Sequence, residues 1–385
     1  MTRSFASRSG YILAMGALAI VLFCLSVLLD RQAFFACWLS AWWTCAGAVL
    51  GSQMNLWLHD LTGGAWGLPL RPIWRRAMAG LPMLLALMLP LIAACWLFYP
   101  WSDPGWTPHS RYPAFQARWL SPAFVTARLL AYGALWQLLS IIPSRQRKGL
   151  SAVGLIIYGL TITLAGVDLI LSLMPQWHSS GFGLIALTMQ MKLGFALAVA
   201  LGAAPHRWQP RRHADRGGMA SDAGATPSST FPGQLGRDWG NLLLMYVMMW
   251  AYLAFVQFLI IWAENLPNEI AWYVPRMQSG WAWLGIFLAC AGFCVPLLLL
   301  LLRSVKQDCR RLRAVAAALC VIGWLESVWV ILPSVPGLGW HALWMAPLAL
   351  AGMAALICYM AISVAPRSRV TQGDRNSMRE LESEP

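Results

Sequence analysis

The sequence predicts an all-α, polytopic membrane protein with about ten transmembrane helices. Hydrophobic residues make up 59% of the 385 residues, and charged residues make up only 11%. A soluble domain of this composition would lack the charged surface that keeps it in solution. Apolar runs of roughly 20 residues recur along the chain, and each matches the thickness of the hydrocarbon core of a bilayer.

Ten segments have the length and the apolar composition of membrane spans. They lie at 11–29, 33–56, 75–98, 120–142, 151–173, 180–202, 241–264, 279–302, 312–332 and 341–364. The first is too long for a signal peptide and lacks a convincing cleavage site, so it is expected to be an anchor. The chain then divides into helices 1–6 (1–203), a cytoplasmic linker (204–240), helices 7–10 (241–365) and a cytoplasmic tail (366–385). The Arg-, Gly-, Ser- and Pro-rich linker is typical of a disordered segment.

The charges of the loops predict that both termini are cytoplasmic. In that orientation 22 of the 28 Lys and Arg residues fall in inside segments and four in outside segments. Such an asymmetry follows the positive-inside rule and indicates a multi-pass protein of a bacterial inner membrane. The net charge of +13 therefore reflects insertion and contact with anionic membrane lipids. No aromatic-basic module accompanies it, so nucleic-acid binding is not indicated.

The cysteines and histidines do not indicate a redox cofactor or a metal site. None of the nine cysteines lies in an outside loop, and no C-x-x-C-H sequence for covalent haem attachment occurs. Cys290 and Cys294 share a helix face but have no histidine neighbours, which is a weak metal signal. Only His59 lies near a span end, so paired axial histidines for a b-type haem are not expected.

The second span ends in a distinctive sequence on the cytoplasmic side. Gly47 and Gly51 have the G-x-x-x-G spacing that permits close helix packing. The span then ends in His59-Asp60-Leu61-Thr62-Gly63-Gly64-Ala65-Trp66-Gly67. His59 is the histidine placed to relay protons near the inner surface. The alternative, which we favour slightly, is an interfacial His and Asp that cap a loop.

The chain around the seventh span, from Trp250 to Trp281, combines apolar, acidic and aromatic residues. Gln257 and Glu264 are seven residues apart, so they share one helix face about 10 Å apart along the axis. A Gln inside the apolar run and a Glu at its end are typical of a polar path. An aromatic belt with solvated acids is the equally weighted alternative.

Charged residues inside the spans are the strongest functional signal of the sequence. Each costs at least a few kcal/mol at the bilayer centre, so each should face the bundle interior and find a partner. By helix rise, Arg128, Asp168 and Glu326 lie roughly 8–12 Å below the outer ends of three spans. The shared depth predicts one polar cluster in the outer half, with Glu264 just above it. Lys192 lies deeper, and its flexible stem is long enough to reach toward the cluster.

Two interpretations of this cluster remain open. In the structural one, Arg128 pairs with a carboxylate and the network fixes helix positions. In the functional one, which we favour, a carboxylate exchanges protons with outer solvent or with a bound quinol. More ionisable groups are present than one neutral pair requires.

Three elements of the chain resemble a known family. The sequence is similar to a large membrane protein of alternative complex III, the quinol:cytochrome c oxidoreductase that is unrelated to the bc1 complex. The resemblance covers most of the ten helices and agrees in order and spacing. It rests on the His59–Gly67 sequence, the Gln257–Trp262 run that leads into Glu264-Asn265-Leu266-Pro267, and Glu269-Ile270 followed by Trp272-Tyr273 and Arg276.

This resemblance implies an architecture and partners. Members of that family are similar to NrfD/PsrC-type quinol-interacting anchors, with two four-helix bundles (here spans 2–5 and 6–9) flanked by the two outer helices. It also implies haem c and iron–sulfur partner subunits and a sister NrfD-like membrane subunit that carries most of the quinol chemistry. This chain would then be a non-redox subunit that interacts with quinone or quinol, or offers a proton pathway.

Two other classes of function are compatible with the residues. In a proton-coupled secondary transporter, Asp168, Lys192 and Glu326 would couple the proton, and the two bundles would be internal repeats. No span is evidently broken at mid-membrane, which argues against a transporter. The third class is a non-catalytic scaffold or assembly subunit.

Overall fold

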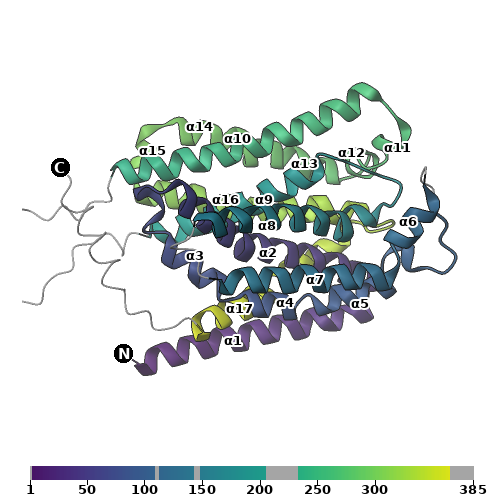
Figure 1. The fold of residues 1–385 in the computed structure, drawn as a ribbon, viewed down its shortest axis with the longest axis horizontal. Coiled ribbons are helices and arrows are strands. Elements are labelled where there is room, and N and C mark those ends of the chain that lie inside the picture. The colour runs from purple at the N-terminus through teal and green to yellow at the C-terminus, as the bar shows by residue number, and fades with distance from the viewer. Residues whose placement is uncertain (1, 109–111, 143–147, 205–232, 365–385) are drawn as a thin grey trace, which may run out of the picture.

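The computed structural model describes residues 2–108, 112–142, 148–204 and 233–364. Within these ranges all regular elements are helices, and nine of them are long and apolar enough to cross a membrane. These helices run side by side along the long axis of the molecule (Figure 1). The described part of the chain therefore confirms an all-α, multi-pass membrane protein.

The nine spans follow the expected order with small shifts at their ends. They are α2 (Arg31–Thr62), α3–α5 (Arg71–Leu97), α7 (Pro122–Ile141), α8 with the turn that follows it (Lys148–Leu173), α9 (Phe182–Gly202), α10 (Gly233–Glu264), α13–α14 (Trp281–Leu301), α16 with the turn that follows it (Cys309–Ser334), and α17 with the turn that precedes it (Ala342–Ser363). The first expected span, 11–29, falls on α1 (Thr2–Leu25), whose apolar stretch Leu13–Leu28 is shorter than the nine. Short helices α6 (Pro113–Trp119), α11 (Pro267–Ile270), α12 (Val274–Met277) and α15 (Arg303–Gln307) lie in the connections.

The linker expected at 204–240 is shorter at its C-terminal side. Because α10 begins at Gly233, residues 233–240 belong to a helix that continues into the membrane span. The rest of the expected linker and the tail from residue 365 onward lie outside the described residues.

Two spans are interrupted, contrary to the expectation that none is broken. The third consists of α3 (Arg71–Met78), α4 (Leu81–Ala86) and α5 (Leu89–Leu97), and each piece begins with a proline in its first turn. In the eighth, a π-helical turn (Cys290–Cys294) separates α13 (Trp281–Ala289) from α14 (Val295–Leu301), and Pro296 follows it. Proline removes a backbone donor and clashes with the preceding turn, which explains the interruptions.

Helices α2 and α9 form the centre of the bundle. Gly51 of α2 lies so close to α9 that an added Cβ would overlap the carbonyl oxygen of Gln190. Gly194 of α9 lies equally close to the backbone of Gly51. In α2, 94% of the most apolar window is buried although the helix is as apolar as a lipid-facing one. Around this pair lie α8, α10 and α16, while α17 packs on α2 and α1 packs on α17.

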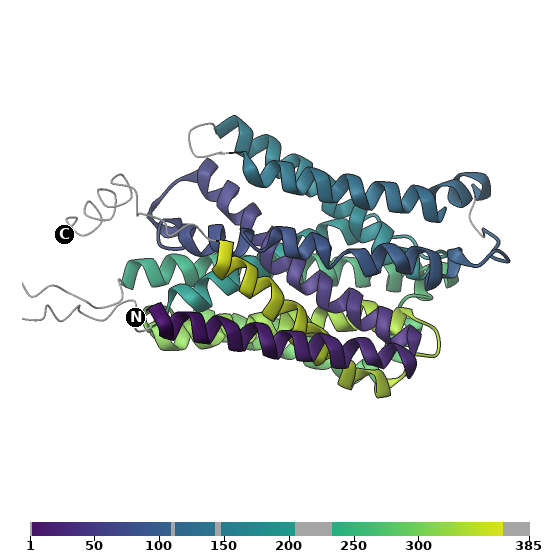
Figure 2. The same ribbon diagram turned by 90° about the horizontal axis from the view of Figure 1, so that it is seen from below.

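The two ends of the bundle carry different elements. The start of α1 and the end of α17 lie toward one end, which we name the terminal end, as both views show (Figures 1 and 2). Helices α6, α11 and α12 lie at the opposite end, which we name the α11 end. Large hydrophobic side chains such as Trp283 (74% exposed) and Phe255 (59% exposed) cover the flanks between these ends. Such flanks are suited to hydrocarbon.

Candidate functional site

Three consecutive residues in the middle of α9 bind three different neighbouring helices. The side-chain oxygen of Gln190 accepts a hydrogen bond from the hydroxyl of Tyr158 on α8. The carbonyl oxygen of Met191 accepts one from the amide of Asn55 on α2, at 2.9 Å. Lys192 then forms an ion pair with α16. Hydrogen bonds between helices are favourable where water is absent, so this stretch of α9 holds the bundle together at mid-membrane.

The ion pair joins Lys192 to Glu326. Nζ of Lys192 lies 2.5 Å from Oε1 of Glu326, and the two side chains are only 1% and 2% exposed. The ring of Trp250 on α10 covers the other side of the ammonium group, with its centroid 4.2 Å from Nζ. Oε2 of Glu326 is buried and has no hydrogen-bond partner. A buried oxygen without a partner is costly, and such atoms mark sites where an additional proton or water is accommodated.

The π-helical turn of the eighth span lies directly beside this pair. Its residue Gly292 faces Glu326: a Cβ added there would lie 3.6 Å from Oε1 of Glu326 and 3.9 Å from Cζ3 of Trp250. Single π-helical turns occur frequently at functional sites, since they shift the helix register by one residue. The glycine in this turn leaves the carboxyl group without a side-chain cover on that side.

A second ion pair connects α7 to α8. The guanidinium of Arg128 donates to both oxygens of Asp168, from Nε to Oδ2 at 2.9 Å and from Nη2 to Oδ1 at 2.7 Å. The hydroxyl of Tyr132 also donates to Oδ2, at 3.0 Å. Nη2 of Arg128 donates to the carbonyl of Trp119, whose ring covers the guanidinium at 4.1 Å. Both carboxylate oxygens of Asp168 are thus occupied, which is the geometry of a structural bidentate pair.

The ionisable residues form two separate pairs and not the single cluster expected from their depth. In the described residues no hydrogen bond or ion pair links Arg128 or Asp168 to Glu326. The reason is that each charge finds an opposite charge on an adjacent helix, so no further contact is needed. Depth along the axis measures only one coordinate, whereas the helix neighbours decide the partners.

His59 at the end of α2 is fully engaged in a local network. Nη1 of Arg71 lies 3.0 Å from Nδ1 of His59, and Nε2 of the same ring lies 3.0 Å from the carbonyl oxygen of Gly64. Arginine can only donate, so Nδ1 must accept and Nε2 carries the proton of a neutral imidazole. Asp60 binds the same arginine at 2.6 Å. Because both ring nitrogens are occupied, the geometry fits the capping interpretation better than a proton relay.

The glycines of the same sequence explain its shape. Gly63 and Gly64 have φ of 70° and 91°, which other residues rarely adopt, and they let the chain reverse after α2. A Cβ at Gly67 would overlap the ring of His59. The carbonyl of Trp66 accepts a hydrogen bond of 2.7 Å from the indole of Trp239, so the turn is anchored to α10.

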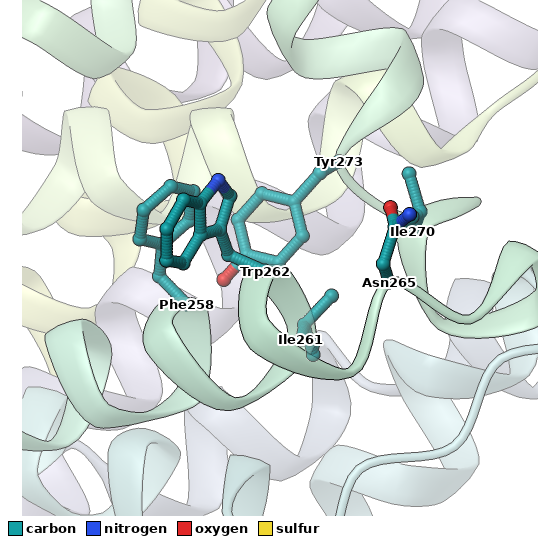
Figure 3. A pocket seen from close by; sticks show the side chains of 6 residues that line it. All are labelled: Phe258, Ile261, Trp262, Asn265, Ile270 and Tyr273. Carbon is teal, nitrogen blue, oxygen red and sulfur yellow. The ribbon is translucent and has the colours of Figure 1, made fainter.

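Gln257 and Glu264 share a face of α10 but are not in one site. Oε1 of Gln257 accepts a hydrogen bond of 2.8 Å from the hydroxyl of Ser179, in the loop before α9. Glu264 is exposed at the end of the helix. Beside it, an aromatic cavity of about 470 Å³ opens at the α11 end (Figure 3). Its lining is formed by Phe258, Ile261, Trp262, Asn265, Ile270 and Tyr273.

Polar groups contribute little to this cavity. In Figure 3 the rings of Phe258 and Trp262 lie at one side, and the side chains of Asn265 and Ile270 lie at the other, with Tyr273 between them. Burial raises the pKa of the Tyr273 phenol above its ordinary value, while a hydrogen bond to Gln257 and the charge of Arg276 oppose the rise. The phenol therefore stays neutral at physiological pH.

Arg276 belongs to the charges that the sequence places in outside loops, but the structure buries it completely. Its Nη2 donates to the carbonyl of Val330 and to the hydroxyl of Ser334, each at 2.6 Å, so it ties α12 to α16. The ring of Trp272 covers the guanidinium at 3.5 Å. Burial lowers the pKa of Arg276 well below its ordinary value. The aromatic residues around it are the sequence signal that could have indicated burial.

Sequence reasoning also missed the uncharged partners at mid-membrane. Asn55 donates to Met191 and accepts a hydrogen bond of 2.7 Å from the hydroxyl of Tyr246, so it joins α2, α9 and α10. Gln190 has a buried amide nitrogen without a partner. A search limited to charges passes over such residues, although an amide inside an apolar run is itself a signal.

Comparison with known proteins adds no family. No protein-family model matches the chain, and no curated protein matches it. The fold and the described residues define the class as a multi-pass, all-α membrane protein with two ion pairs inside the helix bundle.

Proposed function

We propose that this chain is an integral membrane subunit of a respiratory quinol:cytochrome c oxidoreductase of the alternative complex III type, and that it contributes a proton pathway. The observation that carries the proposal is the Lys192–Glu326 pair, which lies buried at mid-membrane with Oε2 of Glu326 free. Charged residues inside spans are costly and mark ion or proton pathways. The sequence resemblance supplies the type of complex.

The chemistry of quinol oxidation explains why such a site is useful. A quinol that is oxidised releases two electrons and two protons. In the proposed complex the electrons pass to haem c and iron–sulfur subunits, and the quinol interacts mainly with a sister membrane subunit. The protons need groups that bind and release them inside the membrane. Glu326 can take a proton at Oε2 while Oε1 stays bonded to Lys192.

Of the two pairs, the one at Glu326 fits a proton site better. Asp168 has both oxygens bonded to Arg128 and receives a further hydrogen bond from Tyr132. A proton on either oxygen would therefore displace an existing donor. Glu326 offers an oxygen that no donor occupies.

Purification from native membranes in mild detergent, followed by substitution, tests the proposal. We expect haem c and iron–sulfur subunits to co-purify with the chain. Glu326→Gln should keep the complex and its haem content, but lower quinol:cytochrome c turnover by about a hundredfold, since a general acid–base group is lost. Glu264→Gln, at the exposed end of α10, is the matched control and should leave turnover unchanged. A chain that purifies alone, or unchanged turnover in Glu326→Gln, contradicts the proposal.

A proton-coupled secondary transporter is the second candidate, and the interrupted spans favour it. Discontinuous helices are typical of the binding sites of such transporters. Here the π-helical turn of the eighth span lies beside Glu326, and the third span consists of three pieces. The same purification discriminates the two candidates. A lone chain that moves a solute into proteoliposomes only under a proton gradient supports the transporter.

A further inference from the structure

We propose that Trp250 is a positioning residue that holds the ammonium group of Lys192 whenever Glu326 carries a proton. This inference rests on the proposed proton role of Glu326 and names the group that makes it possible. It concerns one indole ring of α10, which lies over Nζ with its centroid 4.2 Å away.

The charge balance of the pair creates the need for such a group. With Glu326 ionised, the pair is neutral, and Nζ of Lys192 is bonded to Oε1 at 2.5 Å. When a proton from water binds at Oε2, an O–H bond forms there and Lys192 keeps its three protons. The pair then carries one positive charge in a water-free interior, which is unfavourable for an ammonium group without a strong partner.

The structure supplies only one other partner for this charge. Among the described residues, Lys192 is the one charged group that acts on Glu326, and no second acid is bonded to Lys192. The titratable groups on the helices packed around the pair include Tyr158, Tyr246 and Cys320, which are uncharged near neutral pH. The face of an indole carries negative charge density and attracts a desolvated cation more strongly than other aromatic rings do. Trp250 therefore stabilises the protonated state of the pair.

Gly292 leaves room for this exchange. Its missing side chain keeps the space between Oε1 of Glu326 and the edge of Trp250 open, as the distances of 3.6 and 3.9 Å from an added Cβ show. The ammonium can thus shift from the carboxyl oxygen toward the ring without meeting a side chain of the π-helical turn. The flexible stem of lysine permits such a shift.

Infrared spectroscopy of the full chain in nanodiscs tests the inference without any turnover. The carbonyl stretch of a protonated carboxyl group is recorded as a function of pH, and the band that Glu326→Gln removes belongs to Glu326. Trp250→Leu should move the midpoint of this band about one unit to lower pH, because the protonated state loses its cation–π partner. Trp250→Phe keeps an aromatic face and should restore most of the wild-type midpoint.

The control is Trp262→Leu, which removes an exposed indole from the same helix at the α11 end. It should leave the midpoint unchanged. The inference is overturned if Trp250→Leu and Trp262→Leu give the same midpoint, or if Trp250→Phe behaves like Trp250→Leu. It is also overturned if no carboxyl band disappears in Glu326→Gln. The proposed function is tested separately by turnover, so a midpoint that ignores Trp250 leaves that proposal standing.

Discussion

Inside this bundle, single side chains are held by opposite charges and by rings. Lys192 has Glu326 on one side and Trp250 on the other, and Arg128 has Asp168 on one side and Trp119 on the other. Each cation thus combines an ion pair with an aromatic face, which is favourable when both are removed from water. The pairs differ in the carboxylate, since only that of Glu326 has an unoccupied oxygen.

The Lys192–Glu326 pair should show a strong coupling in a double-mutant cycle. Glu326→Leu alone leaves an unpaired buried ammonium, which we expect to cost about 3–5 kcal/mol of stability. Lys192→Met combined with Glu326→Leu should recover most of that loss, since an apolar pair fills the space without charge. Thermal unfolding in detergent measures both. Additive losses in the double variant would show that the two side chains are not coupled.

At the second pair, geometry should matter more than charge. Arg128→Lys keeps the positive charge but loses the two parallel hydrogen bonds to Asp168 and the flat contact with Trp119. We expect a loss of about 1–3 kcal/mol and a lower melting temperature. Lysine at position 128 that melts like the wild type would contradict the bidentate description.

At the scale of elements, the apolar runs predicted the helices well, but not how each one is built. Length and composition identify spans such as α9 because the bilayer fixes both. The breaks in α3–α5 follow from Pro82 and Pro90, which the sequence displays openly, whereas the π-helical turn at Gly292 has no comparable signal. Partners were the least predictable feature: shared depth suggested one cluster, while helix adjacency produced two pairs.

The contact of α2 with α9 should depend on glycine at position 51. Gly51→Ala places a methyl group against the carbonyl oxygen of Gln190, so the helices must separate. We expect a loss of about 1–3 kcal/mol, as for other overpacked cores, together with a weaker bond from Asn55 to Met191. Gly159→Ala on α8 is the matched control, since an added Cβ meets nothing within 4 Å there. The control should melt at or slightly above the wild-type temperature. Equal melting of both variants would mean that the α2–α9 contact is not tightly packed.

At the scale of the whole molecule, burial is concentrated in two helices and exposure in the others. The most apolar window of α2 is 94% buried and that of α9 is 72% buried, whereas those of α10 and α13–α14 are only 17% and 22% buried. The large apolar face of α10, α13 and α14 therefore faces lipid or another membrane subunit. A sister subunit of the proposed complex would occupy this face, on the side of the bundle where Trp250 and Glu326 lie.

The orientation expected from the loop charges makes a prediction for the entire bundle. Cysteines introduced one at a time at Asn268 in α11 and at Arg311 in α16, in a chain whose native cysteines are replaced by serine, mark its two ends. A membrane-impermeant maleimide should label the Asn268 site in intact spheroplasts, because the α11 end carries few basic residues and is expected outside. The Arg311 site, 60% exposed in a basic segment, should react only in inverted vesicles. The opposite pattern would place both termini outside, and Glu326 would then exchange protons with the cytoplasmic side of the membrane.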